Sequence, residues 1–271
     1  MSSNYRHAPT LITDLDAFLQ RNISRRNALK FGVASAGLAA TFSGAVNAAC
    51  VSQIPSETAG PFPADGGRWS NVNALLLDGI VRRNLRTSLG TGNVAEGEEL
   101  TVNLQLVNVN PDVDCLNLEG YVVYIWHCNR DGGYSLYDSG IRDEDYLRGV
   151  QVADNEGKLS FVTTFPACYS QRWPHMHFEI YPSLSLATSA ANKVHTSQLA
   201  FPEDVCNDVY TKAPGYAKSA RELARMTLPT DYIFRDGVSQ QMTTMTGNMD
   251  DGYTATLVVG IDANNDGVAL A

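Results

Sequence analysis

The sequence predicts a mainly β fold: an antiparallel β-sandwich with few short helices and long loops. Aromatic and β-branched residues are plentiful and runs of good helix formers are few, a composition that favours strands. Short segments with strand patterns recur between turn sequences, whereas helical periodicity is confined to about residues 203–212 and 217–226. Several short strands separated by turns, with few helices, are typical of a sandwich.

The predicted strands are of two kinds. Residues 99–109 alternate between apolar and polar side chains, as expected of a half-buried strand. Residues 121–127 form a continuous apolar and aromatic run, as expected of a strand inside the core. The turn sequence Asp154–Gly157 predicts a hairpin between the strands that flank it. In chain order, we expect strands at residues 75–81, 99–109, 121–127, 148–152, 158–165, 175–181, 194–201 and 253–261.

The first 49 residues are expected to be a twin-arginine export signal. The pair Arg25 and Arg26 is followed by an apolar run of small residues and by Asn-Ala-Ala, a small-residue cleavage site. The apolar run of about 16 residues is too short and too weakly hydrophobic for a membrane span. Acylation of Cys50 after cleavage stays open. Residues 50–271 are expected to form one domain that is periplasmic or extracellular. Within this domain, residues 53–63 are rich in Pro and Gly and are expected to form an extended arm.

Charge and cysteine content restrict the partners. The formal net charge of −9 over 271 residues argues against nucleic acid and against anionic membrane surfaces. The twin-arginine route carries folded proteins, often with a cofactor already inserted, which makes a metal site more plausible. In an exported protein, five cysteines suggest up to two disulfides and one odd thiol. These cysteines are Cys50, Cys115, Cys128, Cys168 and Cys206.

Two histidines lie on one face of the predicted strand at residues 175–181. Side chains alternate along a strand, so His175 and His177 point the same way. Two neutral imidazoles at this spacing can share a metal ion. The alternative is a polar outer face that happens to contain histidines. Tyr169 and Arg172, close upstream, favour the metal site.

Two longer motifs extend this pattern. The first is W-H-x-N-x-x-G-x-Y-S-x-Y-D from Trp126, followed by L-R-G at residues 147–149. The second is P-x-x-Y-x-x-R-x-x-H-x-H-F from Pro166. Together they resemble the intradiol ring-cleavage dioxygenases, specifically the exported single-chain, protocatechuate-dioxygenase-like branch. The resemblance covers roughly residues 55–261, and the spaced Tyr, Tyr, Arg and His-x-His set is far more specific than any single part.

The resemblance implies that Tyr134, Tyr169, His175 and His177 bind one non-haem Fe(III). Phenolate is a hard, strongly donating anion that stabilises ferric iron, whereas Zn²⁺ or Cu²⁺ is usually held by His, Cys or carboxylate ligands. A ferrous site with two histidines and one carboxylate would need an acid ligand, and Glu179 is the only local candidate.

The resemblance also implies an enzyme of aromatic compound catabolism. A catechol-type substrate would react with O₂ and open between its two hydroxyl-bearing carbons to a muconate-type diacid. Tyr169 would leave the metal and act as a base, and Arg172 would face the ring and stabilise its developing charge. Gln198 aligns with a glutamine near the oxygen-binding side. The alternatives are a surface salt bridge for Arg172 and a solvated strand position for Gln198.

Other functions and features stay open. A non-enzymatic sandwich of the transthyretin-like or carbohydrate-binding kind would share the fold, and a hydrolase could use His-x-His with another metal; the four-ligand set favours the dioxygenase. His127 is expected to be a hydrogen-bonded structural histidine. Residues 262–267 resemble the start of a calcium loop without its closing Glu. The particular catechol and a homo-oligomeric state are also left open.

Overall fold

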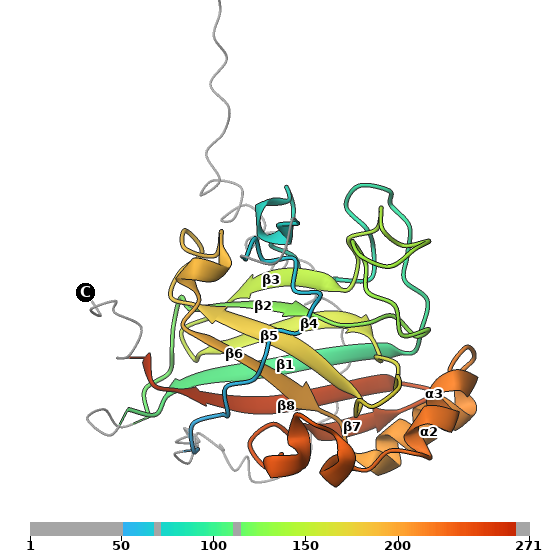
Figure 1. The fold of residues 1–271 in the computed structure, drawn as a ribbon. Helices are drawn as coiled ribbons and strands as arrows, with labels where there is room; N and C mark the ends of the chain where they lie inside the picture. The colour runs from blue at the N-terminus through green and yellow to red at the C-terminus, as the bar shows by residue number, and fades with distance from the viewer. Residues whose placement is uncertain (1–50, 68–71, 111–114, 264–271) are drawn as a thin grey trace, which may run out of the picture. The chain divides into compact units, whose positions relative to one another are not determined.

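Two four-stranded sheets pack face to face in the part of the chain that the structure describes, residues 51–67, 72–110 and 115–263 (Figure 1). The structure is a computed structural model. One sheet has the order β4-β1-β8-β7 and the other β3-β2-β5-β6. The predicted mainly β sandwich is therefore confirmed. The strands are β1 (Glu99–Asn108), β2 (Val122–Trp126), β3 (Arg148–Val152), β4 (Lys158–Thr164), β5 (His175–Tyr181), β6 (His195–Ala200), β7 (Thr244–Asn248) and β8 (Gly252–Ile261).

The main core lies between the two sheets. Val102 and Leu104 of β1 face it, while the polar residues that alternate with them are less buried. Met176, Phe178 and Ile180 of β5 enter the same core from the other sheet. Full burial of such a side chain contributes roughly 1.5–3 kcal/mol. Because strand side chains alternate, the opposite face of β5 is left for its histidines.

Strands β1 and β8 run parallel, from Leu100 beside Tyr253 to Asn108 beside Ile261. The other ladders between the described strands are antiparallel, as predicted, so this pair is the exception among them. These two strands come from opposite ends of the domain. No tight turn joins them, so the connection imposes no antiparallel direction.

The predicted hairpin at Asp154–Gly157 is wrong, although the turn itself is present. The amide of Gly157 donates to the carbonyl of Asp154 over 2.9 Å. Beyond the turn, β3 pairs with β2 whereas β4 pairs with β1 in the other sheet. The turn is therefore a corner at which the chain passes from one sheet to the other.

Two further elements differ from the expectations. The apolar run at residues 75–81 contains no strand: η1 (Ala74–Leu76) is a 3₁₀ turn in which the amide of Leu75 donates to the Asn73 side chain. This cap competes with the extended backbone that the apolar pattern favours. Strand β7 was not predicted, because its Thr-Met-Thr-Gly-Asn sequence lies mostly exposed and shows no apolar alternation.

The helices close one end of the core. The predicted helices are confirmed as α2 (Glu203–Lys212) and α3 (Ala217–Leu223), the second ending earlier than expected. Tyr210 and Tyr216 donate hydrogen bonds to the carbonyls of Pro166 and Phe165, at the start of the loop that carries Tyr169. The short 3₁₀ turns η2 (Ala190–Asn192), η3 (Leu228–Thr230) and η4 (Phe234–Asp236) lie in connecting loops.

The extended arm predicted at residues 53–63 is present and is the blue segment in Figure 1, and the structure shows that it lies against β6. The hydroxyl of Ser197 donates to the carbonyl of Pro55 over 2.7 Å, and the side-chain Nε2 of Gln198 donates to the carbonyl of Thr58 over 3.0 Å. Both strand residues come from the strand next to β5. The arm therefore lies over the sheet near its histidines.

The disulfide prediction is corrected by the structure. Cys128, Cys168 and Cys206 are free and buried, and Cys115 is disulfide-bonded. The structure thus has three free thiols where one was expected, which leaves at most one disulfide among the five cysteines. The proposed export signal at residues 1–49, Cys50, and most of the calcium-like segment at residues 262–267 lie outside the described residues. No helix in the described ranges is long and apolar enough to cross a membrane.

Candidate active site

His175 and His177 lie on the face of β5 that points away from the main core. Only 1% and 3% of their surfaces are exposed, so the alternative of a solvated polar face is wrong. The indole of Trp126 on β2 stacks on His177, with ring centroids 5.1 Å apart and planes inclined by 6°. On the other side, a β-carbon at Gly60 of the arm would lie 3.3 Å from the His177 ring. Arm and sheet thus enclose the imidazole.

Tyr134 lies on the loop after β2. Asn129 accepts a hydrogen bond from the amide of Gly133, and Asp138 accepts one from the amide of Tyr134, as expected of Asn and Asp in turns. The Tyr134 ring is buried, 4.9 Å from the ring of Phe62. The loop sequence and the arm therefore hold this phenol firmly.

Arg148 joins the Tyr134 loop to the arm. Its guanidinium donates to the hydroxyl and carbonyl of Ser135 and to the carbonyls of Phe62 and Pro63. The side chain is fully buried. One residue of the L-R-G motif therefore ties together two segments that contact Tyr134.

Tyr169 lies on the loop between β4 and β5 and is only half-buried. The amide of Arg172 donates to the carbonyl of Tyr169 over 3.1 Å, which closes a turn. Gln171 within this turn has a φ of 65°. The turn brings the phenol back over the start of β5, beside His175.

The four donor atoms predicted to bind a metal converge. The phenol oxygen of Tyr134 lies 3.1 Å from that of Tyr169 and 3.4 Å from Nε2 of His177. Nε2 of His175 lies 3.1 Å from the Tyr169 oxygen and 3.2 Å from Nε2 of His177. Two loops and one strand thus place these four donor atoms in a closed circle of contacts, which we call the donor ring.

These donors fit a bound metal ion. Atoms with bonds of about 2.0–2.1 Å to one ion lie roughly 3–3.5 Å apart, as they do here. Nδ1 of His175 donates to the Trp173 carbonyl over 2.5 Å, which leaves a lone pair on Nε2, directed at the other donors. Among the described residues, no three His, Cys, Asp or Glu side chains gather as a metal site would require. A site here must therefore include the phenols.

Burial sets the protonation of the four donors. Desolvation, with a contribution from Arg172, lowers the pKa of His175 and His177 well below the usual value, so both rings are neutral. Desolvation raises the pKa of Tyr134 and Tyr169, so both phenols stay protonated at neutral pH. Binding of both as phenolates would release two protons.

Arg172 and Gln198 belong to the same cluster. Arg172 donates from Nη1 to Nε2 of His175 over 3.1 Å and from Nη2 to Oε1 of Gln198 over 2.5 Å. Its Nε pairs with Asp231. Gln198 is fully buried and lies opposite His177 in the β5–β6 ladder. The alternatives of a surface salt bridge and a solvated strand position are therefore wrong.

Glu179 lies apart from the four donors. Its carboxylate accepts a hydrogen bond from Tyr181 and forms an ion pair with Lys193 over 2.5 Å. Burial raises its pKa to about 7. The carboxylate is thus committed to a structural network, and no contact with the histidines supports the ferrous alternative.

His127 is a structural histidine, as predicted. It is buried, with Nε2 2.6 Å from the Thr163 hydroxyl and Nδ1 2.8 Å from the Cys128 carbonyl. It belongs to the hydrogen-bonded framework rather than to the donor ring.

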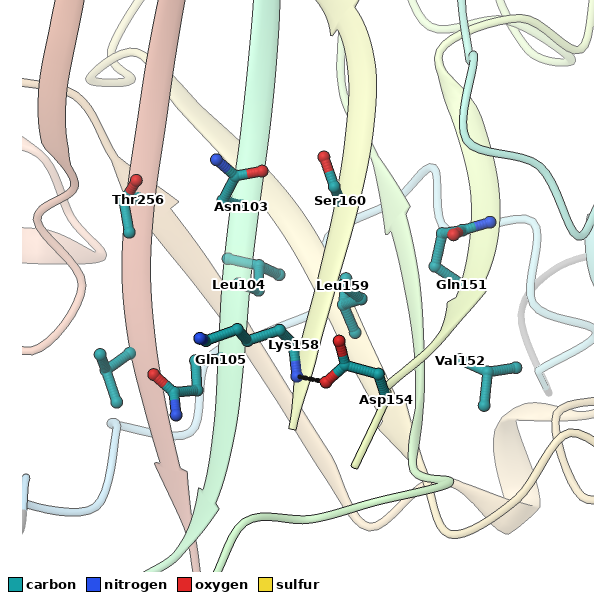
Figure 2. A pocket seen from close by; sticks show the side chains of 11 residues that line it. Asn103, Leu104, Gln105, Gln151, Val152, Asp154, Lys158, Leu159, Ser160 and Thr256 are labelled. Carbon is teal, nitrogen blue, oxygen red and sulfur yellow. Dashed lines mark hydrogen bonds between the residues drawn. The ribbon is translucent and has the colours of Figure 1, made fainter. Parts of the chain in front are cut away.

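A hollow of about 500 Å³ lies elsewhere, along the β4-β1-β8 sheet (Figure 2). Asn103, Gln105, Ser160 and Thr256 line it together with Gln151 of β3, and none of the predicted site residues does. The hollow is therefore not part of the donor cluster.

Sequence reasoning missed Gly60, Phe62 and Asp231. The Gly-Pro-Phe-Pro run of the arm was a signal for irregular backbone, but not for contact with a histidine. Asp231 lies in a loop without any periodic pattern.

Comparisons with known proteins find similar chains among dioxygenases. A family model described as Dioxygenase matches residues 82–221, which is 140 of the 271 residues. The chain is similar to an intradiol ring-cleavage dioxygenase from Tetranychus urticae, with 25% identity and a TM-score of 0.58, over 78% of this chain and 95% of that one. It is also similar to hydroxyquinol 1,2-dioxygenase from Pseudomonas putida DLL-E4, with 16% identity and a TM-score of 0.46, over 77% and 66% of the two chains. No curated protein matches the chain.

Proposed function

We propose that this chain, which belongs to the family of intradiol ring-cleavage dioxygenases, is an Fe(III)-dependent enzyme of aromatic compound catabolism. It cleaves a catechol-type aromatic with O₂ between the two hydroxyl-bearing carbons and gives a muconate-type diacid. The convergence of two phenol oxygens and two imidazole nitrogens within 3.1–3.4 Å of their neighbours is the observation that carries this proposal.

Tyr134, Tyr169, His175 and His177 would hold the iron. Two phenolates offset two of the three charges of Fe(III), and the two neutral imidazoles complete the donor set. Bound there, ferric iron would draw electron density from a chelated catecholate and make its ring reactive toward O₂.

Tyr169 is the better candidate for the base that takes a substrate proton. It lies half-buried on a loop, whereas Tyr134 is buried against Phe62. Desolvation raises the Tyr169 pKa, so its phenolate would be a strong proton acceptor. The difference in burial supports this proposed division of roles between the two phenols.

Arg172 supplies a fixed positive charge beside the donors. Its guanidinium is buried and directed at His175, where negative charge on a bound ring would develop. Preorganised donors at such a position stabilise a transition state by several kcal/mol, about 3 for one oxyanion-hole donor. Gln198 holds the guanidinium on its other side and completes the polar wall.

The first experiment uses the purified protein. Phenolate-to-Fe(III) charge transfer should make it red-brown, and a panel of catechols followed by diene-diacid absorbance should show ring cleavage. His175→Ala should abolish cleavage, whereas His195→Ala, on the neighbouring strand β6, should retain it. A colourless, iron-free protein after expression with ample iron would contradict the proposal.

We also propose that the twin-arginine signal exports the chain to the periplasm or the cell exterior. The support is the sequence of residues 1–49 alone. Exchange of Arg25 and Arg26 for lysine should keep the protein in the cytoplasmic fraction. Export of the exchanged protein at the original level would rule this route out.

A further inference from the structure

Asp231 lies directly behind Arg172 and is fully buried. Its Oδ2 accepts a hydrogen bond from Nε of Arg172 over 3.0 Å and another from the amide of Trp173 over 2.6 Å. Its Oδ1 accepts from the amides of Ile233 over 2.7 Å and Phe234 over 3.1 Å. All the hydrogen-bonding directions of this carboxylate are thus used by one side chain and three backbone amides.

These contacts fix the orientation of the guanidinium. Asp231 holds Nε and Gln198 holds Nη2, so Nη1 is left to point at Nε2 of His175. A planar guanidinium held at two of its three nitrogens cannot rotate about its long axis. The direction of the charge toward the donor ring therefore depends on Asp231.

The same carboxylate also positions the rings that cover Arg172. It bonds the backbone of the loop around η4, and the Tyr232 and Phe234 rings of this loop lie 5.1 and 5.9 Å from the guanidinium carbon. Phe234 also lies 6.4 Å from the His175 ring. The buried Asp231 carboxylate thus binds both the covering loop and the Arg172 guanidinium, and these two in turn contact His175.

We propose that Asp231 is the positioning residue for Arg172: it aims the guanidinium at the reacting ring and holds the covering loop against it. This inference rests on the proposed function, in which Arg172 stabilises the charge that develops on the substrate. Asp231 itself does not touch the donor ring. Its effect on the reaction is therefore expected only through Arg172.

The test compares Asp231→Asn with the wild type, alone and in an Arg172→Gln background. Asparagine keeps the size but lacks the charge, so kcat per bound iron should fall by about 10²-fold while KM changes by less than about threefold. In the Arg172→Gln background the same exchange should change kcat by less than about threefold. A purely structural role would instead give the same loss in both backgrounds, and that result, or an unchanged kcat, would overturn the proposal.

Two controls separate positioning from loss of fold. Thr230→Ala removes hydroxyl hydrogen bonds to Thr227 in the same loop but does not touch Arg172, and its kcat should stay at the wild-type level. If Asp231→Asn does not fold, Asp231→Glu keeps the charge but displaces it by one methylene. Its kcat should fall with KM unchanged, and a wild-type kcat would overturn the proposal.

A readout without iron or activity separates this inference from the proposed function. Phenylglyoxal modifies accessible guanidinium groups, and mass spectrometry of the iron-free protein can follow Arg172. Its modification should be faster in folded Asp231→Asn than in the wild type and unchanged in Thr230→Ala. Equal rates in all three proteins would refute the positioning role, whereas a wild type without ring cleavage would refute the proposed function.

Discussion

The phenol oxygen of Tyr134 lies 3.1 Å from that of Tyr169, although 35 residues separate the two in sequence. Burial raises the pKa of both phenols, so without a cation each stays protonated. A metal that binds both must offset the loss of two protons from a buried site. A highly charged ion such as Fe(III) meets this demand best.

Exchange of Tyr134 for phenylalanine should bleach the protein or release its iron. The variant keeps the ring that packs on Phe62 but loses one anionic donor. Absorbance in the visible range and iron content per chain are the measurements. Tyr210→Phe is the matched control, since Tyr210 is equally buried and donates to the Pro166 carbonyl away from the donor ring. It should lose about 1 kcal/mol of stability and no colour.

Gly60→Ala should weaken iron binding. Gly60 has a φ of +68°, and a β-carbon there would lie 3.3 Å from the His177 ring. Gly92→Ala is a control with the same backbone strain, because Gly92 has a φ of +75° and no atom within 4 Å of the added carbon. Each exchange should cost roughly 1–2 kcal/mol of stability. Only Gly60→Ala should release iron at a lower chelator concentration, and equal release would show that the arm does not support His177.

His127 should make the fold sensitive to mild acid. Burial lowers its pKa to about 4, whereas the unfolded chain takes up this proton near 6.5. Between these values the unfolded state binds more protons, so the free energy of unfolding falls as the pH decreases, by up to about 1.4 kcal/mol per pH unit. Urea unfolding of wild type and His127→Gln should show a stability difference that shrinks from pH 7 to pH 4.5. A difference that stays constant would contradict the assignment.

The free cysteines should be inert in the folded protein. Burial raises the pKa of Cys128 and Cys168 to about 12 and also raises that of Cys206, so at pH 8 all three are protonated and enclosed. A chromogenic thiol reagent should label none of them in buffer and all three in denaturant, without reductant. Rapid labelling of the native protein would show that one of these positions opens to solvent.

Local pattern was sufficient to predict most elements. The alternation in residues 175–181 separates Met176 from His175 and predicts both faces of β5 correctly. The helix at residues 203–212 agrees at both ends with α2. Partner choice was not predictable in the same way, because the turn at Asp154–Gly157 is compatible with a hairpin and with a corner between sheets. Which one forms depends on apolar surfaces far away in sequence.

In the candidate site, too, some residues were predictable from sequence motifs and others were not. The positions of Tyr134 and Tyr169 followed from motifs that resemble a known family, and the geometry then brought their oxygens together. Asp231 could not be anticipated, because it meets Arg172 across 59 residues and no spacing rule links them. Contacts of this kind depend on how the loops pack over the finished sheet, so no local pattern contains them.

The parallel pairing of β1 with β8 has a consequence for the order of events during synthesis. The two inner strands of one sheet, β1 and β8, are the first and the last of the described strands. The pairing of β1 with β8 can therefore be completed only after residue 261 has left the ribosome. Pairing over such a sequence distance is slow. The sheet is therefore complete only after nearly all of the described chain has been synthesised. If the chain is exported already folded, as we propose, that sheet is completed in the cytoplasm, where the proposed iron would also be bound before export.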